Sequence, residues 1–111
     1  MPVEKLHVGD AGTTVVVQVV EENSLGVLVA ADVSTATTME IKVQDPVTGI
    51  TLTKTAALKT DGLDGRIKFD SLATDFGNSG PWPIQTHLII PGSPEWDGHS
   101  DKDTLLVWDN L

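Results

Sequence analysis

The amino-acid sequence predicts an all-β chain, an antiparallel sandwich or small barrel of about seven or eight strands. Three observations lead to this prediction. The chain contains 13 Val and 13 Thr, β-branched residues that favour strands over helices. Apolar residues recur with period two in short runs, and clusters of turn-forming residues separate the runs at intervals of about 8–12 residues. No segment has the spacing and length of a credible helix, so both layers of the fold must be sheets.

The first half of the chain is expected to hold four strands, over residues 13–21, 27–31, 38–44 and 50–57. The first of these is apolar on both faces, so we expect both faces to be covered by other parts of the protein or the strand to lie at an interface. Residues 22–26 are predicted to form a turn and residues 32–37 an irregular segment. Asp45-Pro46-Val47-Thr48-Gly49 has the composition of a hairpin loop. In the strand that follows it, Ile50 and Leu52 are expected to face the core.

The second half is expected to hold three strands, over residues 66–70, 82–90 and 104–108, after a tight turn at 61–65. Residues 71–76 have room for one helical turn with Ser71 as its cap. The longest strand places Trp82 on the core face, and Pro81 and Pro83 should prevent this end from pairing fully. Residues 91–103 are predicted to form a long polar loop. In the closing strand, Leu105 and Val107 are expected to point inward.

Length and composition limit the functional classes. A chain of 111 residues predicts one domain over residues 1–111, with residues 1–12 as an N-terminal arm. Sixteen Asp and Glu against seven Lys and Arg give a net charge of −9, which argues against nucleic acid and anionic membranes as partners. The absence of cysteine excludes disulfides, thiolate metal sites and cysteine nucleophiles. Neither a signal peptide nor a membrane span is expected from the sequence.

The order of features over roughly residues 10–110 resembles a known family. The residues that carry the resemblance are Asp45-Pro46-Val47-Thr48-Gly49, Asp61-Gly62-Leu63-Asp64-Gly65-Arg66, Gly80-Pro81-Trp82-Pro83-Ile84-Gln85 and Gly98-His99-Ser100. In this order they resemble the immunoglobulin-like N-terminal domain of phage baseplate upper proteins and related sandwiches of phage heads and tails. The resemblance implies an immunoglobulin-like antiparallel β-sandwich and a structural protein of the virion. Its implied partners are other virion proteins and copies of itself, and it brings no catalytic residues. A tail or baseplate, a neck and a capsid-decorating position all stay open.

Two groups of acidic residues are candidate calcium sites, since hard cations take oxygen ligands. Asp61 and Asp64 lie on a Gly-rich turn, where the alternative is that each carboxylate caps its own backbone. Asp97 and Asp101 lie in the acidic segment that also contains Glu95 and Asp103, where the alternatives are a solvated loop and a surface for a basic partner. We favour the turn for the first group and a site without metal for the second, so no cofactor is expected.

The sequence contains no arrangement typical of an enzyme. His99 and Ser100 are neighbours, but the surrounding residues lack the Gly-x-Ser-x-Gly pattern of a nucleophile elbow. His7, His87 and His99 do not have the spacing of a zinc site, and the best pair they offer is His99 with Asp97 or Asp101. We therefore expect a protein that binds rather than catalyses.

Several apolar residues fall on strand faces or loops that a lone sandwich does not cover. They predict an interface, because large exposed apolar patches usually mark one. The candidate interface residues are Val16, Val20, Trp96, Leu106, Trp108 and Leu111. A different interpretation of Trp96 is a stacking platform for a sugar. The alternative functions are therefore a carbohydrate-binding module and a cell-surface adhesion domain.

Overall fold

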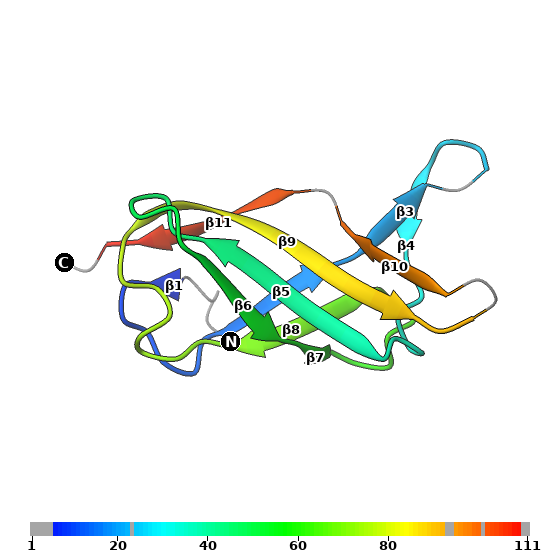
Figure 1. Ribbon diagram of the computed structural model, residues 1–111, viewed down its shortest axis with the longest axis horizontal. Coiled ribbons are helices and arrows are strands. Elements are labelled where there is room, and N and C mark those ends of the chain that lie inside the picture. The colour runs from blue at the N-terminus through cyan, green and yellow to red at the C-terminus, as the bar shows by residue number, and fades with distance from the viewer. Residues whose placement is uncertain (1–5, 23, 93–94, 101, 110–111) are drawn as a thin grey trace.

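The computed structural model describes residues 6–22, 24–92, 95–100 and 102–109. Within these ranges the chain forms eleven strands and no helix (Figure 1). The predicted all-β class is therefore confirmed. The strands make three sheets, and residues of the two larger sheets share one buried core in the manner of a β-sandwich.

The largest sheet has the strand order β1-β11-β9-β5-β6, and β10 also pairs with β9. Its strands are β1 (Leu6–His7), β5 (Thr38–Gln44), β6 (Thr51–Thr55), β9 (Gly80–Ile90), β10 (Trp96–His99) and β11 (Asp103–Trp108). β1 runs parallel to β11, with Leu6 opposite Val107. The ladders of β9 with β5, β10 and β11 are antiparallel, so β9 is the central strand of this sheet.

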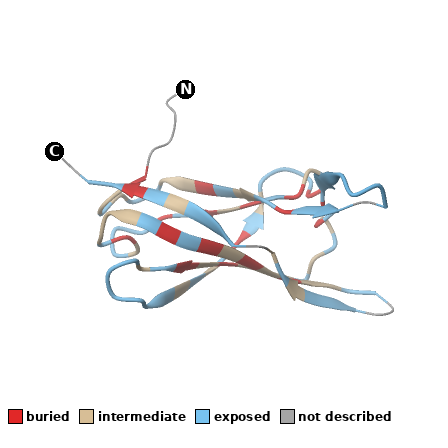
Figure 2. Ribbon diagram, turned by 90° about the horizontal axis from the view of Figure 1, so that it is seen from above, coloured by how far each residue is buried: buried red, intermediate tan, exposed pale blue. Residues whose placement is uncertain are grey.

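The second sheet has the order β2-β8-β7, and the third is a two-stranded hairpin of β3 and β4. Their strands are β2 (Thr14–Gln18), β3 (Val20–Glu22), β4 (Leu28–Ala30), β7 (Ala57–Leu58) and β8 (Arg66–Asp70). The β3–β4 hairpin projects from one end of the molecule, at the upper right of Figure 1. None of the residues in these two strands is buried, as the pale blue of this hairpin shows in Figure 2.

The core between the two larger sheets is centred on aromatic side chains. The ring of Trp82 meets Phe76 edge-on at a centroid distance of 4.8 Å, and Phe76 stacks on Phe69 at 6.3 Å. The indole Nε1 of Trp82 donates a hydrogen bond to the carbonyl oxygen of Asn78 at 3.0 Å, which satisfies its buried polar atom. The other large side chains that are almost completely buried are Val33, Ile41, Val43, Ile67, Leu88 and Val107. The inward faces predicted for residues 66–70 and for Trp82 are therefore confirmed.

The turn predicted over residues 45–49 closes the β5–β6 hairpin. Oδ1 of Asp45 accepts hydrogen bonds from the backbone N–H groups of Val47 and Thr48, and Gly49 has a φ of 75°. These hydrogen bonds, with one from Asn78, hold the pKa of Asp45 below its ordinary value despite the opposing effect of burial. Ile50 belongs to this turn and lies exposed, so the expectation that it faces the core is wrong.

Eleven strands in the described residues exceed the seven or eight expected, because two of the predicted strands are interrupted and because β1 and β10 form in segments expected to be an arm and a loop. The predicted strand over residues 13–21 becomes β2 and β3, with Val19 between them. The predicted strand over residues 50–57 becomes β6 and β7, which lie in different sheets on either side of Ala56. Such breaks follow from the choice of pairing partners, which the alternation of apolar residues does not reveal.

The N-terminal arm expected over residues 1–12 is packed on the body of the molecule from Leu6 onward. The side chain of Leu6 is buried, β1 pairs with β11, and the N–H of Gly12 donates to the carbonyl oxygen of Ser71. Residues 1–5 lie outside the described residues. The segment after β8 forms a turn in place of the expected helical turn, and Oγ of Ser71 accepts the N–H of Thr13 and donates to the carbonyl oxygen of Asp10 instead of capping it.

The prediction of a polar loop over residues 91–103 is wrong for residues 96–99. Residues 96–99 form β10, which pairs with the end of β9, and Trp96 lies opposite Ile90. The effect expected of the prolines at the start of β9 is confirmed. The ladder with β5 reaches no further than Ile84, and β11 alone continues beside Pro81 and Pro83.

Candidate functional site

One long side of the sandwich is open, because β2 and β3 do not pair with the strands that face them. Three cavities follow this side, with volumes of about 220, 470 and 340 Å³. The first lies between β2 and β11, the second between β2 and residues 100–105, and the third between β3 and β10. We call this face, with β2 and β3 opposite β11 and β10, the open side.

The structure brings all the described candidate interface residues to the open side. Val16, Leu106 and Trp108 line the 220 Å³ cavity. Val20 lines both larger cavities, and Trp96 lines the 340 Å³ cavity at the far end. Each of these five side chains is between 43% and 47% exposed, so each is half-buried against the groove. Leu111, the sixth candidate, lies outside the described residues.

Trp96 is held in place by the strand that carries it. A Cβ built at Gly98 would lie 2.6 Å from the indole of Trp96, so the ring covers the backbone of Gly98. Any other residue at position 98 would displace the ring. Glycine two residues after the tryptophan therefore allows one face of the indole to lie on β10 itself.

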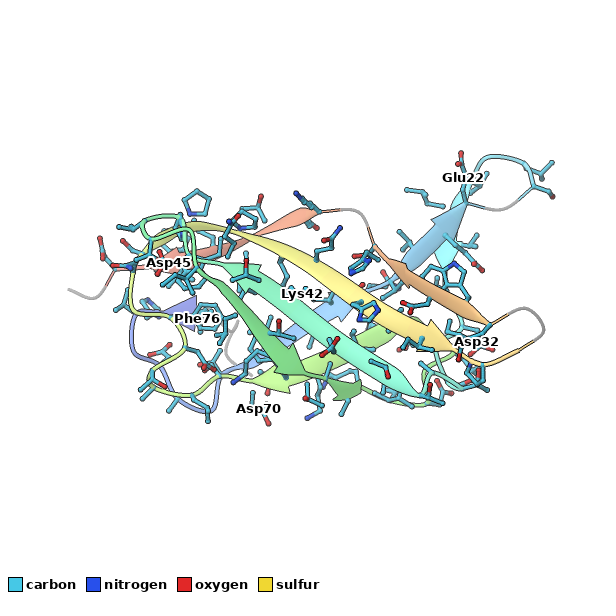
Figure 3. All side chains as sticks on the ribbon, viewed as in Figure 1. Glu22, Asp32, Lys42, Asp45, Asp70 and Phe76 are labelled. Carbon is cyan, nitrogen blue, oxygen red and sulfur yellow. The ribbon has the colours of Figure 1, made fainter. Side chains whose placement is uncertain are left out.

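The projecting β3–β4 hairpin presents further apolar side chains. Leu25, at its tip, is 85% exposed, and Val27, Leu28 and Val29 are exposed as well. Glu22 lies on the same hairpin, as labelled in Figure 3. A two-stranded hairpin without a packed face is marginally stable alone in water. The hairpin is joined to the body through Val19, whose N–H donates to Gly65 O at 2.8 Å and whose carbonyl accepts from Ala31 N at 2.9 Å.

A polar cluster links three strands of the largest sheet, β5, β9 and β10. Nδ1 of His87 lies 2.8 Å from Oε1 of Glu40, and its Nε2 lies 2.6 Å from Oδ1 of Asp97. The rings of His87 and His99 stack at a centroid distance of 4.6 Å. The hydrogen bonds to Glu40 and then Asp97 raise the pKa of His87, because both carboxylates favour the imidazolium.

The sequence did not predict this cluster. It depends on the registers that place Glu40 and His99 on either side of His87. The cluster would have been predictable from the alternation of residues along β9 and along a strand paired with it in a hairpin. Residues 91–103 were instead expected to form a loop. The cluster joins β10 to β9 and β5 through side-chain hydrogen bonds, and so holds the strand that carries Trp96 in place.

The candidate cation sites are used for local structure. Oδ1 of Asp61 accepts the N–H of Leu63, and Oδ1 of Asp64 accepts the N–H of Arg66, which lowers the pKa of Asp64. Asp97 is bonded to His87, and Asp101 lies outside the described residues. Among the described residues, no three or more His, Cys, Asp or Glu side chains converge in a way that could hold a metal ion.

Ser100 and His99 are also engaged in structural contacts. The N–H of Ser100 donates to Thr86 O, and Oγ of Ser100 accepts the N–H of Thr86, both at 3.0 Å. These two bonds hold the junction between β10 and β11 against β9. The ring of His99 stacks on His87, as described above. The neighbouring pair in the sequence is therefore a strand junction in the structure.

Comparisons of the chain with models of protein families, with curated proteins and with solved structures find no match. The described residues contain no helix that is long and apolar enough to span a membrane.

Proposed function

We propose that this chain is a non-enzymatic structural subunit of a bacteriophage virion, which works through protein–protein interfaces. One observation carries the proposal: the five described interface candidates lie together along the open side. They come from two segments of the chain, β2–β3 and β10–β11, which face each other across the three cavities of this side. A half-exposed apolar groove with two Trp residues is typical of a surface that a partner covers.

The strand order supports the immunoglobulin-like form of the sandwich. β2, β8 and β7 follow the order B-E-D of one immunoglobulin sheet. β11, β9, β5 and β6 follow the order G-F-C-C′ of the other sheet in variable-type domains. With this order, the chain is suited to a tail, baseplate, neck or capsid-decorating position, as the resemblance implies. The expected partners are other virion proteins and copies of this chain, and the expected location is the virion, after synthesis in the host cytoplasm.

The charge distribution supports the same proposal. The net charge of −9 makes the protein surface as a whole acidic. Charged residues near an interface set the orientation and rate of encounter more than the affinity. The apolar side chains of the open side supply the affinity, and the acidic loops select partners with basic surfaces.

The proposal is tested on purified particles and on variants of the open side. Quantitative proteomics of gradient-purified particles should find the chain at a fixed copy number. Trp96→Ala and Trp108→Asp should each lower incorporation into particles at least tenfold while leaving the unfolding midpoint nearly unchanged. Ile50→Asp is the matched control, because Ile50 is exposed and apolar but lies in the β5–β6 turn. Absence of the chain from intact particles would overturn the proposal.

One observation favours a second candidate function, carbohydrate binding. Trp96 lines the 340 Å³ cavity together with Asp32 and His99, a combination of aromatic and polar groups that suits a sugar ring. A glycan array distinguishes the two functions. Sugar binding that Trp96→Ala abolishes and Trp108→Asp preserves would replace the virion proposal with a carbohydrate-binding or adhesion module.

A further inference from the structure

We infer that two copies of this chain associate by pairing β2 and β3 of one copy, antiparallel, with β2 and β3 of the other. The pairing is centred on Gln18, which lies opposite Gln18 of the partner subunit. This inference rests on the proposed function, and it specifies the strands that form the interface between copies of the chain.

The hydrogen-bond pattern shows which backbone groups face the unpaired edge. Ser71 N donates to Thr13 O, and Val19 N donates to Gly65 O, so odd-numbered residues of β2 point toward β8. Val19 O accepts from Ala31 N, so odd-numbered residues of β3 point toward β4 on the same side. Since neighbouring residues of a strand point in opposite directions, the even-numbered residues direct their N–H and C=O groups to the other edge.

This second edge is continuous over nine residues. The residues that face it are Thr14, Val16, Gln18, Val20 and Glu22. In the described part of the chain, β2 pairs only with β8 and β3 only with β4. The open edge therefore borders the groove of the open side along its whole length.

The edge lacks the features that keep other edges unpaired. Proteins protect edge strands with Lys, Pro, bulges or very short strands. Residues 14–20 have the sequence Thr-Val-Val-Val-Gln-Val-Val, with no charge, Pro or Gly, and Glu22 is the one charged residue among the five that face the edge. The edge of the largest sheet at β6, by contrast, carries Lys54 and a run of exposed Thr. The contrast indicates that the edge of β2 and β3 pairs with a strand of another copy.

The edge is complementary to itself in one register. With Gln18 at the twofold axis, Val16 lies opposite Val20 of the partner subunit, and Thr14 lies opposite Glu22 of the partner subunit. The two exposed valines thus cover each other, and no like charges face each other directly. All five outward residues enter hydrogen-bonded pairs, which gives about ten backbone hydrogen bonds. Centring on Val16 would leave Val20 and Glu22 unpaired.

The number of hydrogen bonds in this contact is what a specific interface has. Nine strand residues extend about 30 Å. About ten backbone hydrogen bonds along this length match the roughly ten direct hydrogen bonds of an interface of standard size, which buries about 1,600 Å² in all. Symmetric dimers are moreover the commonest homo-oligomers.

The absence of cysteine allows the register to be read by disulfide formation. In a hydrogen-bonded antiparallel pair the Cα atoms are about 5.5 Å apart, within the range of a disulfide. Gln18→Cys should therefore form a covalent dimer under mild oxidation. Val16→Cys should cross-link at least tenfold more slowly, because the two copies of residue 16 are offset by four residues, about 14 Å. Thr53→Cys, exposed on β6, is the control for random collision.

Sedimentation of the unsubstituted chain gives an independent measurement. It should show a dimer, and Val16→Lys should weaken dimerisation at least tenfold while leaving the far-ultraviolet circular dichroism unchanged. A chain that is monomeric at about 100 µM would overturn the inference, because interfaces of this size have dissociation constants of micromolar or below. Cross-linking of Val16→Cys as fast as Gln18→Cys would overturn the register, and with it the pairing.

The outcomes separate this inference from the proposed function. A monomeric chain that is still present in particles at fixed copy number refutes the edge pairing and leaves the virion proposal standing. A dimer with the expected cross-link that is absent from particles does the reverse. Pairing of the edge with a strand of another protein would be detected as protection of β2 amides from exchange only in the particle, and would also refute the inference.

Discussion

Gly65 is the residue at which a single methyl group should cost most, and the structure allows the cost to be calculated. Gly65 has a φ of 73°, and a Cβ added to it would collide with the carbonyl oxygen of Val19 and lie 2.9 Å from that of Ala31. The left-handed conformation alone costs an L-residue about 1–2 kcal/mol. The collision also displaces Val19, whose two backbone hydrogen bonds contribute about 1 kcal/mol each. Gly65→Ala should therefore lower the free energy of unfolding by about 3–4 kcal/mol.

Gly49→Ala is the matched control for this prediction. Gly49 has a φ of 75°, but nothing lies within 4 Å of a Cβ built on it. Only the backbone strain remains, and part of it is offset by the reduced entropy of the unfolded chain, so the loss should be about 1 kcal/mol. Equilibrium unfolding in urea measures both variants, and a difference of about 2 kcal/mol shifts the midpoint by about 1 M or more. Equal losses for the two variants would refute the reasoning, because the contact with Val19 is what distinguishes them.

Three further predictions concern the core and its polar contacts. Oγ1 of Thr86 is buried and has no hydrogen-bond partner among the described residues, so Thr86→Val should raise the free energy of unfolding by about 1 kcal/mol; a loss would show that the hydroxyl is satisfied. Nζ of Lys54 lies 2.9 Å from the largely buried Oδ2 of Asp75, so Lys54→Met should destabilise by about 1–3 kcal/mol, and Asp75→Asn in the same chain should recover part of the loss. Because the folded-state pKa of His87 is raised above 6.5, its stabilising effect is complete below about pH 6.5 and is lost as the pH rises through the raised value. The destabilisation by His87→Gln, followed by thermal unfolding, should therefore be larger at pH 6 than at pH 9, and an equal effect at both would contradict the assignment.

The sequence predicted the fold class and most strand faces, because both follow from local information. Alternation alone placed Trp82 and Leu88 in the core and Leu106 and Trp108 outside it, as the structure shows. The Asp-rich turns were predictable for the same reason, since an Asx turn and its Gly lie within five residues. These features require no knowledge of which strands pair.

The features that the sequence did not predict all depend on pairing. β10 forms because residues 96–99 pair with the end of β9. Their own composition, Trp-Asp-Gly-His, does not favour a strand. The contacts of His87 with Glu40 and Asp97 follow from two registers that no local pattern specifies. The gathering of Val16, Val20 and Trp96 on one side likewise needs the arrangement of both sheets, although each was individually predictable as exposed.

The three tryptophans allow unfolding and binding to be followed by the intrinsic fluorescence of the protein. The sequence contains no Tyr, so near-ultraviolet emission comes from indole alone. Trp82 lies in the core, whereas Trp96 and Trp108 are half-exposed along the open side. Unfolding transfers Trp82 to water and shifts the emission to longer wavelength, whereas covering the open side removes water from the other two and shifts it to shorter wavelength. Loss of structure and gain of a partner thus move the same unlabelled spectrum in opposite directions, so a titration of the unmodified protein can distinguish them.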